Sequence, residues 1–195
     1  MRDVMRLLTA VERTAEQERQ LGIVREGCAK TDARLREQGI DLDVSVERAL
    51  DELIEGVPGG AHGAAYTYAF HEVVATHFSD ITDLGVWTRP SWFFALDDEL
   101  ARYGVPADLL PGSFLFSGPP LRLPPPGDTF PQIGVLPAPR AAALAAAYEA
   151  VADWLGPDYR ATARKFAELM RFEAEEWESA QQLGQRLDTI FFWFR

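Results

Sequence analysis

Cysteine and lysine are scarce in this chain of 195 residues, which contains one cysteine, Cys28, and two lysines, Lys30 and Lys165. A single thiol excludes an intrachain disulfide and a CxxC metal clip. Charged residues surround Cys28 in a helical pattern, which favours a small, partly buried helix residue. A catalytic thiol would need a neighbouring base, and the sequence does not identify one.

Long apolar runs are also absent. No stretch approaches the roughly 20 apolar residues of a membrane span, and residues 141–148 are mostly alanine and too short. The N-terminus, Met1 to Arg6, is charged and lacks the apolar core of a signal peptide. We therefore expect a cytoplasmic protein without a membrane partner.

The sequence contains none of the common catalytic motifs, because the candidate residues do not have the required spacing. His71 and His77 lie six residues apart, so their side chains point about 120° apart on a helix, whereas a zincin helix needs histidines at i and i+4. The di-iron ExxH pattern, the GxSxG elbow, the P-loop and GxGxxG are all absent. The sequence thus predicts no metal site, no cofactor and no catalytic residue that it can name.

Basic charge is in deficit, because 30 acidic residues face 19 basic ones and the net charge is −11. The deficit is concentrated in residues 61–158, where 11 acids face 4 bases. Such a surface repels phosphate backbones, which argues against a nucleic-acid partner. A basic protein partner fits this charge, and simple solubility is the plain alternative.

Helical patterns cover most of the chain. Apolar residues recur near a 3.6-residue period, with capping residues and glycines at the boundaries. Gly22 is expected to break or kink the first helix. The predicted helices are 2–38, 44–55, 64–78, 91–104, 139–155 and 158–183. We expect an N-terminal helical segment at 1–40 and an α+β core domain at 41–195.

Proline dominates residues 106–139, which hold ten of the 13 prolines. This density predicts no helix there, and only short extended pieces at 113–117 and 132–135. Residues 118–127 read as a covering strap, with a partner-binding tail or an inter-domain linker as alternatives. The apolar residues 189–194 predict an inner strand of a sheet. The fold class expected is therefore α+β, mainly helical, with a small sheet that includes the C-terminal strand.

A set of aromatic and imidazole side chains forms the candidate site. Inward-facing aromatic rings with polar tips can line a pocket, and they can equally be core residues with satisfied hydrogen bonds. Among the carboxylates of residues 173–178, Glu173 lies on the apolar side of its predicted helix. The candidate pocket residues are Tyr66, Tyr68, His71, His77, Trp87, Trp92 and Glu173.

Several short stretches resemble an uncharacterised actinobacterial family that has some likeness to the YfbM-like proteins. The stretches are residues 66–71, Trp92-Phe93, 118–121, 130–136 and 190–194. The resemblance covers roughly residues 45–195 and rests mostly on packing and turn residues. It implies an α+β fold with helices around a small sheet, and it implies no activity, cofactor or catalytic residue.

Three functions compete on these observations. The favoured hypothesis is a non-catalytic protein-interaction or binding module, with a basic protein as one form of partner. The alternative is a small-molecule-binding protein or enzyme that uses the candidate pocket. A third is a homodimer that associates through the N-terminal helix.

Overall fold

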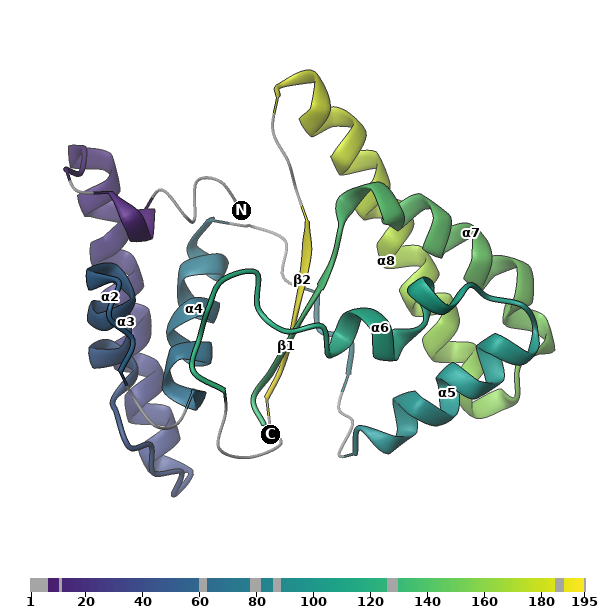
Figure 1. Cartoon of the computed structure of the whole chain (residues 1–195), viewed down its shortest axis with the longest axis horizontal. Coiled ribbons are helices and arrows are strands. Elements are labelled where there is room, and N and C mark those ends of the chain that lie inside the picture. The colour runs from purple at the N-terminus through teal and green to yellow at the C-terminus, as the bar shows by residue number, and fades with distance from the viewer. Residues whose placement is uncertain are drawn as a thin grey trace. The chain divides into compact units, whose positions relative to one another are not determined.

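The computed structural model of the chain describes residues 7–10, 12–59, 63–77, 82–85, 89–125, 130–184 and 188–194. The described part is mainly helical, with a two-stranded antiparallel sheet that includes the C-terminal strand (Figure 1). The predicted fold class is thereby confirmed. The chain divides into two compact units. Unit 1 comprises Met1–Thr82, Leu121–Gln132 and Phe192–Arg195, and unit 2 comprises Asp83–Pro120 and Ile133–Phe191.

Unit 1 contains three helices that pack against one another: α2 (Ala15–Glu37), α3 (Val46–Glu55) and α4 (Ala64–His77). Thr14 starts α2 with a capping box: its side chain accepts the Gln17 N–H, and the Gln17 side chain accepts the Thr14 N–H. Ser45 caps α3, as the sequence predicts, by accepting the Arg48 N–H. Each helix thus has at least one of the unpaired N–H groups of its first turn bonded to a capping side chain.

The compact units do not divide at residue 40, because α2 lies in the same unit as α3 and α4. Asp32 of α2 accepts the backbone N–H groups of Val46 at 2.8 Å and Glu47 at 3.2 Å. This carboxylate therefore supplies a second cap to α3 and ties α2 to the helix that follows. Gly22 does not break α2, which continues through it; the chain instead leaves the helical conformation ahead of Thr14.

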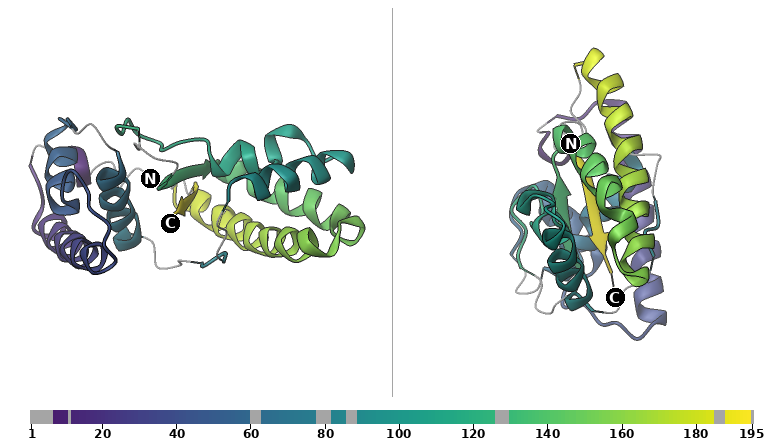
Figure 2. Two further views of the ribbon diagram at one scale, coloured as in Figure 1. Left: turned by 90° about the horizontal axis from the view of Figure 1, so that it is seen from below. Right: turned by 90° about the vertical axis from the view of Figure 1, so that its right-hand side faces the viewer.

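Unit 2 contains a long antiparallel helix pair, α7 (Ala141–Val151) and α8 (Pro157–Gln182), together with α5 (Ser91–Arg102) and α6 (Pro111–Leu115). Three short 3₁₀ turns connect these helices: η1 (Ala107–Leu109), η2 (Ala138–Arg140) and η3 (Ala152–Trp154). Figure 2 shows α7 and α8 side by side. Buried rings fill the space between the helices, and they belong to Phe93, Phe114, Tyr148, Phe166 and Phe191.

Residues 113–117 were expected to be extended, and this prediction is wrong. Residues 111–115 form α6, because Pro111 occupies its first position, where a missing N–H costs nothing. The other predicted strand is confirmed as β1 (Gln132–Leu136), and it pairs with β2 (Thr189–Trp193). Only Phe191 of β2 is buried, so β2 is not the inner strand that its apolar sequence predicts.

The proline-rich segment 121–125 belongs to unit 1 and lies against the start of α4. The Gly63 N–H donates to the Pro125 carbonyl at 2.8 Å. A Cβ at position 63 would lie 1.8 Å from the Pro124 carbonyl oxygen, so only glycine permits this approach. Leu121 and Leu123 are half-buried while Arg122 is exposed, which matches the alternation expected of a covering strap. No helix in the described ranges is long and apolar enough to cross a membrane.

Candidate functional site

Helix α4 brings two of the predicted site residues together with the end of the chain. Tyr68 stacks on Phe194, with ring centroids 4.8 Å apart and planes 14° apart. His71, one turn further on, presents an edge-to-face contact to Phe192 at 4.9 Å and to Phe194 at 5.0 Å. Phe192 and Phe194 themselves lie nearly parallel. The result is an aromatic cluster, Tyr68, His71, Phe192 and Phe194, on one side of α4 in unit 1.

Tyr66 is fully buried and points away from that cluster toward α3. Its hydroxyl donates a hydrogen bond to Glu52, which also pairs with Arg48 and accepts from the Gly59 N–H. These bonds hold the pKa of Glu52 below its usual value, and the bond from Tyr66 is the largest cause. The polar tip of Tyr66 is therefore satisfied inside unit 1 and fixes the loop that follows α3.

Glu72 is the one carboxylate of α4, and it has several partners. It lies within 3.6 Å of His71 Nδ1, and its Oε1 accepts the Thr31 hydroxyl of α2 at 2.8 Å. The contact with His71, and then the bond from Thr31, lower the pKa of Glu72 although its partial burial opposes this. Gly27 of α2 leaves the space that the carboxylate occupies, since a Cβ there would lie 2.5 Å from Glu72 Oε2.

Cys28 lies near this carboxylate, and its environment suppresses its reactivity. The thiol is fully buried, and burial, followed by the negative charges of Glu72 and Asp32, raises its pKa to about 12. A thiol in that state stays protonated at neutral pH, whereas the thiolate is the nucleophile. Cys28 beside Glu72 is therefore not an activated nucleophile, because the main charges that act on the thiol are negative.

Three other predicted site residues, His77, Trp92 and Glu173, have contacts of their own. His77 places Nδ1 2.7 Å from the Val73 carbonyl oxygen of its own helix. Trp92 belongs to unit 2, where it packs on Phe93 and Tyr159. Glu173 also belongs to unit 2, where it accepts the Thr189 hydroxyl at 2.8 Å. Trp87 lies outside the described residues.

The described side chains offer little chemistry. No group of three or more His, Cys, Asp or Glu among them could hold a metal ion. Burial raises the pKa of Tyr68, so its hydroxyl stays protonated at neutral pH, and Arg34 only partly opposes this shift. Tyr148 of unit 2 is buried and donates to the Leu109 carbonyl at 2.7 Å, as a structural hydroxyl does.

The sequence alone missed the residues that complete this arrangement. Phe192 and Phe194 were assigned to a strand, and nothing local shows that they meet α4. Thr31 and Gly27 carry no functional signal in isolation. The single usable signal was the Tyr68 and His71 spacing of i, i+3, which correctly places both side chains on one face.

A family model described as a domain of unknown function (DUF7691) matches residues 1–193, and the chain therefore belongs to that family. The match includes the first 40 residues, in keeping with the packing of α2 on α3 and α4. Comparison with curated proteins finds no match, and comparison with solved structures finds none either.

Proposed function

Since the family to which the chain belongs has no assigned function, we propose from the geometry that this protein is a non-catalytic protein-interaction module. The observation that carries the proposal is that the polar groups of the candidate site bond within the chain. Tyr66 donates to Glu52, Thr31 donates to Glu72, and His77 contacts the Val73 carbonyl. A catalytic or ligand site would instead direct such groups toward a substrate.

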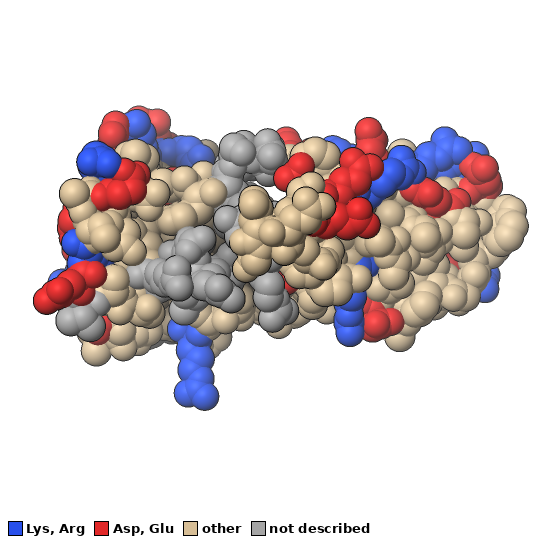
Figure 3. All heavy atoms as spheres, turned by 90° about the horizontal axis from the view of Figure 1, so that it is seen from above, with Lys and Arg blue, Asp and Glu red and all other residues tan. Residues whose placement is uncertain are grey.

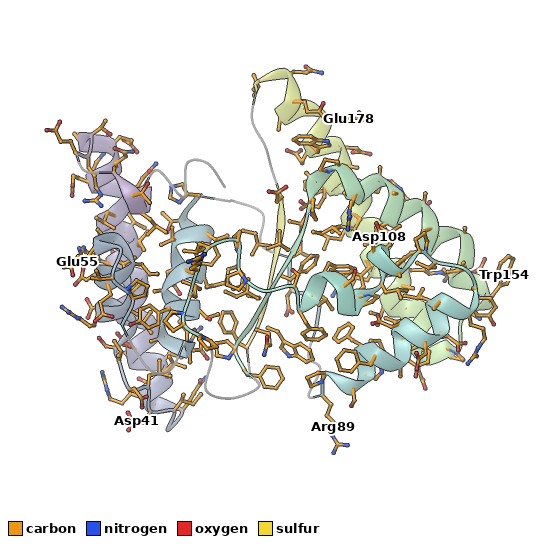
Figure 4. All side chains as sticks on the ribbon, in the orientation of Figure 1. Asp41, Glu55, Arg89, Asp108, Trp154 and Glu178 are labelled. Carbon is orange, nitrogen blue, oxygen red and sulfur yellow. The ribbon has the colours of Figure 1, made fainter. Side chains whose placement is uncertain are left out.

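Exposed apolar side chains support the same proposal. Unit 2 carries Phe94, Trp154 and Phe172, with relative exposures of 53%, 64% and 44%. Aromatic side chains of this kind dominate the energetics of protein interfaces. Figure 4 shows Trp154 directed outward from unit 2. A partner that docked on unit 2 could bury these side chains.

The proposal is tested by capture of the tagged full-length chain from a lysate of cells that produce it, at low salt and at about 0.5 M salt. The expected result is a stoichiometric protein partner, held more weakly at high salt because the chain carries a net charge of −11. A chain that retains no partner at any salt concentration would contradict the proposal.

One observation favours small-molecule binding as a second candidate. The His71 side chain stays 27% exposed beside Glu72 and between two aromatic rings. Titration of the protein with small aromatic acids, followed by the NMR signals of the His71 ring, tests this candidate. Signals that do not move with any such ligand would exclude it.

Location and origin are also proposals. The absence of a long apolar run in the sequence supports a cytoplasmic location, and the resemblance noted above supports a bacterial origin and some likeness to the YfbM-like proteins. Neither adds an activity. Acidic charge supports a protein partner over a nucleic acid.

A further inference from the structure

We propose that the outward face of the C-terminal half of α8, residues 172–183, docks a basic amphipathic helix of a partner protein. This inference rests on the proposed function and names the surface and the chemistry of the partner. We call residues 172–183 the α8 end.

The α8 end has little of the core contact that holds the rest of the helix. In the N-terminal part of α8, Ala163, Phe166, Ala167 and Met170 are buried, whereas Ala180 is the one buried residue between 171 and 182. Figures 1 and 2 show this end of the helix extending past α7. This part of α8 therefore presents much of its surface to solvent.

Two large apolar side chains lie on that exposed surface. Phe172 is 44% exposed, and Leu183, which caps the helix, is 75% exposed. They are eleven residues apart, which is three helical turns, so they point the same way about 16 Å apart. Glu176 and Ser179 lie between them on the same stripe and are exposed too. The spacing i, i+4, i+7, i+11 is the one by which a helix face engages a partner helix or groove.

The charge of the α8 end is of one sign. Residues 172–183 contain no lysine or arginine, and their exposed acidic residues are Glu175, Glu176 and Glu178. Glu173 is half-buried and accepts the Thr189 hydroxyl. Figure 3 views the molecule from above the orientation of Figure 1 and shows acidic side chains gathered right of centre. Figure 4 shows Glu178 directed away from the helix. The last turn of α8 has no basic residue.

This electrostatic arrangement selects the partner. Basic residues on a docked helix would relieve the repulsion among the glutamates, while its apolar residues would cover Phe172 and Leu183. A second copy of this chain would bring the same carboxylates face to face, which like-charge repulsion opposes.

Two other exposed rings in unit 2 already pack on a neighbouring ring. Trp154 packs on Tyr103, and the neighbouring Asp153 already pairs with Arg164. Phe94 packs on Phe116.

The test uses the full-length chain and a fluorescent synthetic peptide of about 18 residues, long enough to form a helix. The peptide places leucines at i, i+3, i+4 and i+7 and lysines elsewhere. Matched peptides replace lysine with glutamate or scramble the order. Anisotropy titration should show binding of the lysine peptide only, weakened about tenfold by Phe172→Ser and several-fold by Glu176→Lys at low salt.

Two control variants match these changes elsewhere on the chain. Ile23→Ser removes an apolar side chain that is 59% exposed on α2, and Glu55→Lys reverses a glutamate at the C-terminal end of α3. Both should bind the peptide as the wild type does. Equal weakening by the controls, no weakening by Phe172→Ser, or no binding at all would overturn the inference.

Two further outcomes separate this inference from the proposed function. Sedimentation that shows a dimer abolished by Phe172→Ser would make the α8 end a contact between copies and overturn the basic partner. If wild type captures a partner from lysate and both Phe172→Ser and Glu176→Lys capture it equally well, the proposed function stands. That result would refute the α8 end as the docking surface. Capture of nothing by the wild type refutes the proposed function itself.

Discussion

At the residue scale, the packing of α2 on α4 depends on one carboxylate and the space made for it. Glu72 reaches α2 because Gly27 has no side chain, and it is held there by the Thr31 hydroxyl. The same carboxylate lies near the Cys28 thiol and helps to keep it protonated. Gly27, Cys28 and Thr31 carry no motif in the sequence, and all three lie against this half-buried carboxylate.

The Cys28 thiol is predicted to be unreactive in the folded protein. Its pKa of about 12 and its complete burial leave almost no accessible thiolate at pH 8. A chromogenic thiol reagent should therefore label it only as the protein unfolds, with the labelled fraction following the unfolded fraction across a urea titration. Rapid labelling of native protein at pH 8 would contradict this account.

Gly27 and Gly22 form a matched pair for measuring the space around Glu72. Gly22→Ala should stabilise the protein by about 0.5–1 kcal/mol through helix propensity, because no atom lies within 4 Å of the added methyl group. Gly27→Ala should not show this stabilisation, because its methyl group must displace the Glu72 carboxylate from Thr31. Urea unfolding measures both changes.

The double variant tests the cause. In a Glu72→Ala background, Gly27→Ala should stabilise by the same amount as Gly22→Ala, because the obstructing carboxylate is gone. If Gly27→Ala still stabilises less than Gly22→Ala in the Glu72→Ala background, the backbone at position 27 causes the difference and Glu72 does not.

At the element scale, one carboxylate joins two helices of unit 2. Asp97 of α5 accepts the Gly112 N–H at the start of α6, with its two oxygens at 3.0 and 3.1 Å. A Cβ at Gly112 would lie 2.3 Å from Asp97 Oδ2, so glycine is required for this approach. Burial raises the pKa of Asp97 above 3.8, although the bond from Gly112 opposes the shift.

This raised pKa predicts a pH-dependent effect of Asp97→Asn. The folded state binds the proton more tightly than the unfolded state, so the ionised Asp97 lowers stability at pH values above its folded pKa. Asparagine keeps an oxygen for the Gly112 N–H without the charge. Asp97→Asn should therefore increase the free energy of unfolding modestly at pH 7, and the increase should vanish below about pH 3.8.

The control is Asp41→Asn, which removes one negative charge from an exposed loop position. Urea unfolding at pH 7 and at acid pH measures both variants. If the two variants show the same pH dependence, net charge explains the effect and burial of Asp97 does not.

At the scale of the whole molecule, the chain folds as two compact units that are each discontinuous in sequence. Unit 1 takes up residues 121–132 and 192–195 as well as the first 82 residues. The segment 121–125 is held at the start of α4 by the Gly63 N–H and by close backbone contact at Pro124. A glycine in one part of the sequence thus positions a proline-rich segment far along the chain.

Gly63→Ala should displace that segment. Its methyl group would meet the Pro124 carbonyl oxygen at 1.8 Å, which the backbone cannot accommodate without moving, and we expect a loss of about 1–3 kcal/mol of stability. Trypsin should then cleave after the exposed Arg122 faster than in the wild type. Gly59→Ala is the control, since its nearest atom is at an ordinary 3.7 Å. Unchanged cleavage in Gly63→Ala would mean that Gly63 does not hold the segment.

The sequence predicted local structure better than it predicted the site. Ser45, Pro139 and the glycines after the helices mark boundaries that the structure bears out to within a few residues, because caps act through neighbouring N–H groups. The prediction that the proline-rich segment contains no helix is wrong at residues 111–115, because proline is compatible with the first position of a helix.

The amino-acid sequence by itself determined the helical character, the β1 and β2 segments and the absence of recognised catalytic spacings, because each follows from local periodicity and spacing. Only the tertiary structure decided that His71 meets Phe192 and Phe194, that Glu72 occupies the space at Gly27, and that the α8 end has little cover. Those contacts join residues that are distant in the sequence. Packing selects which residues meet, and the local sequence pattern carries no information on it.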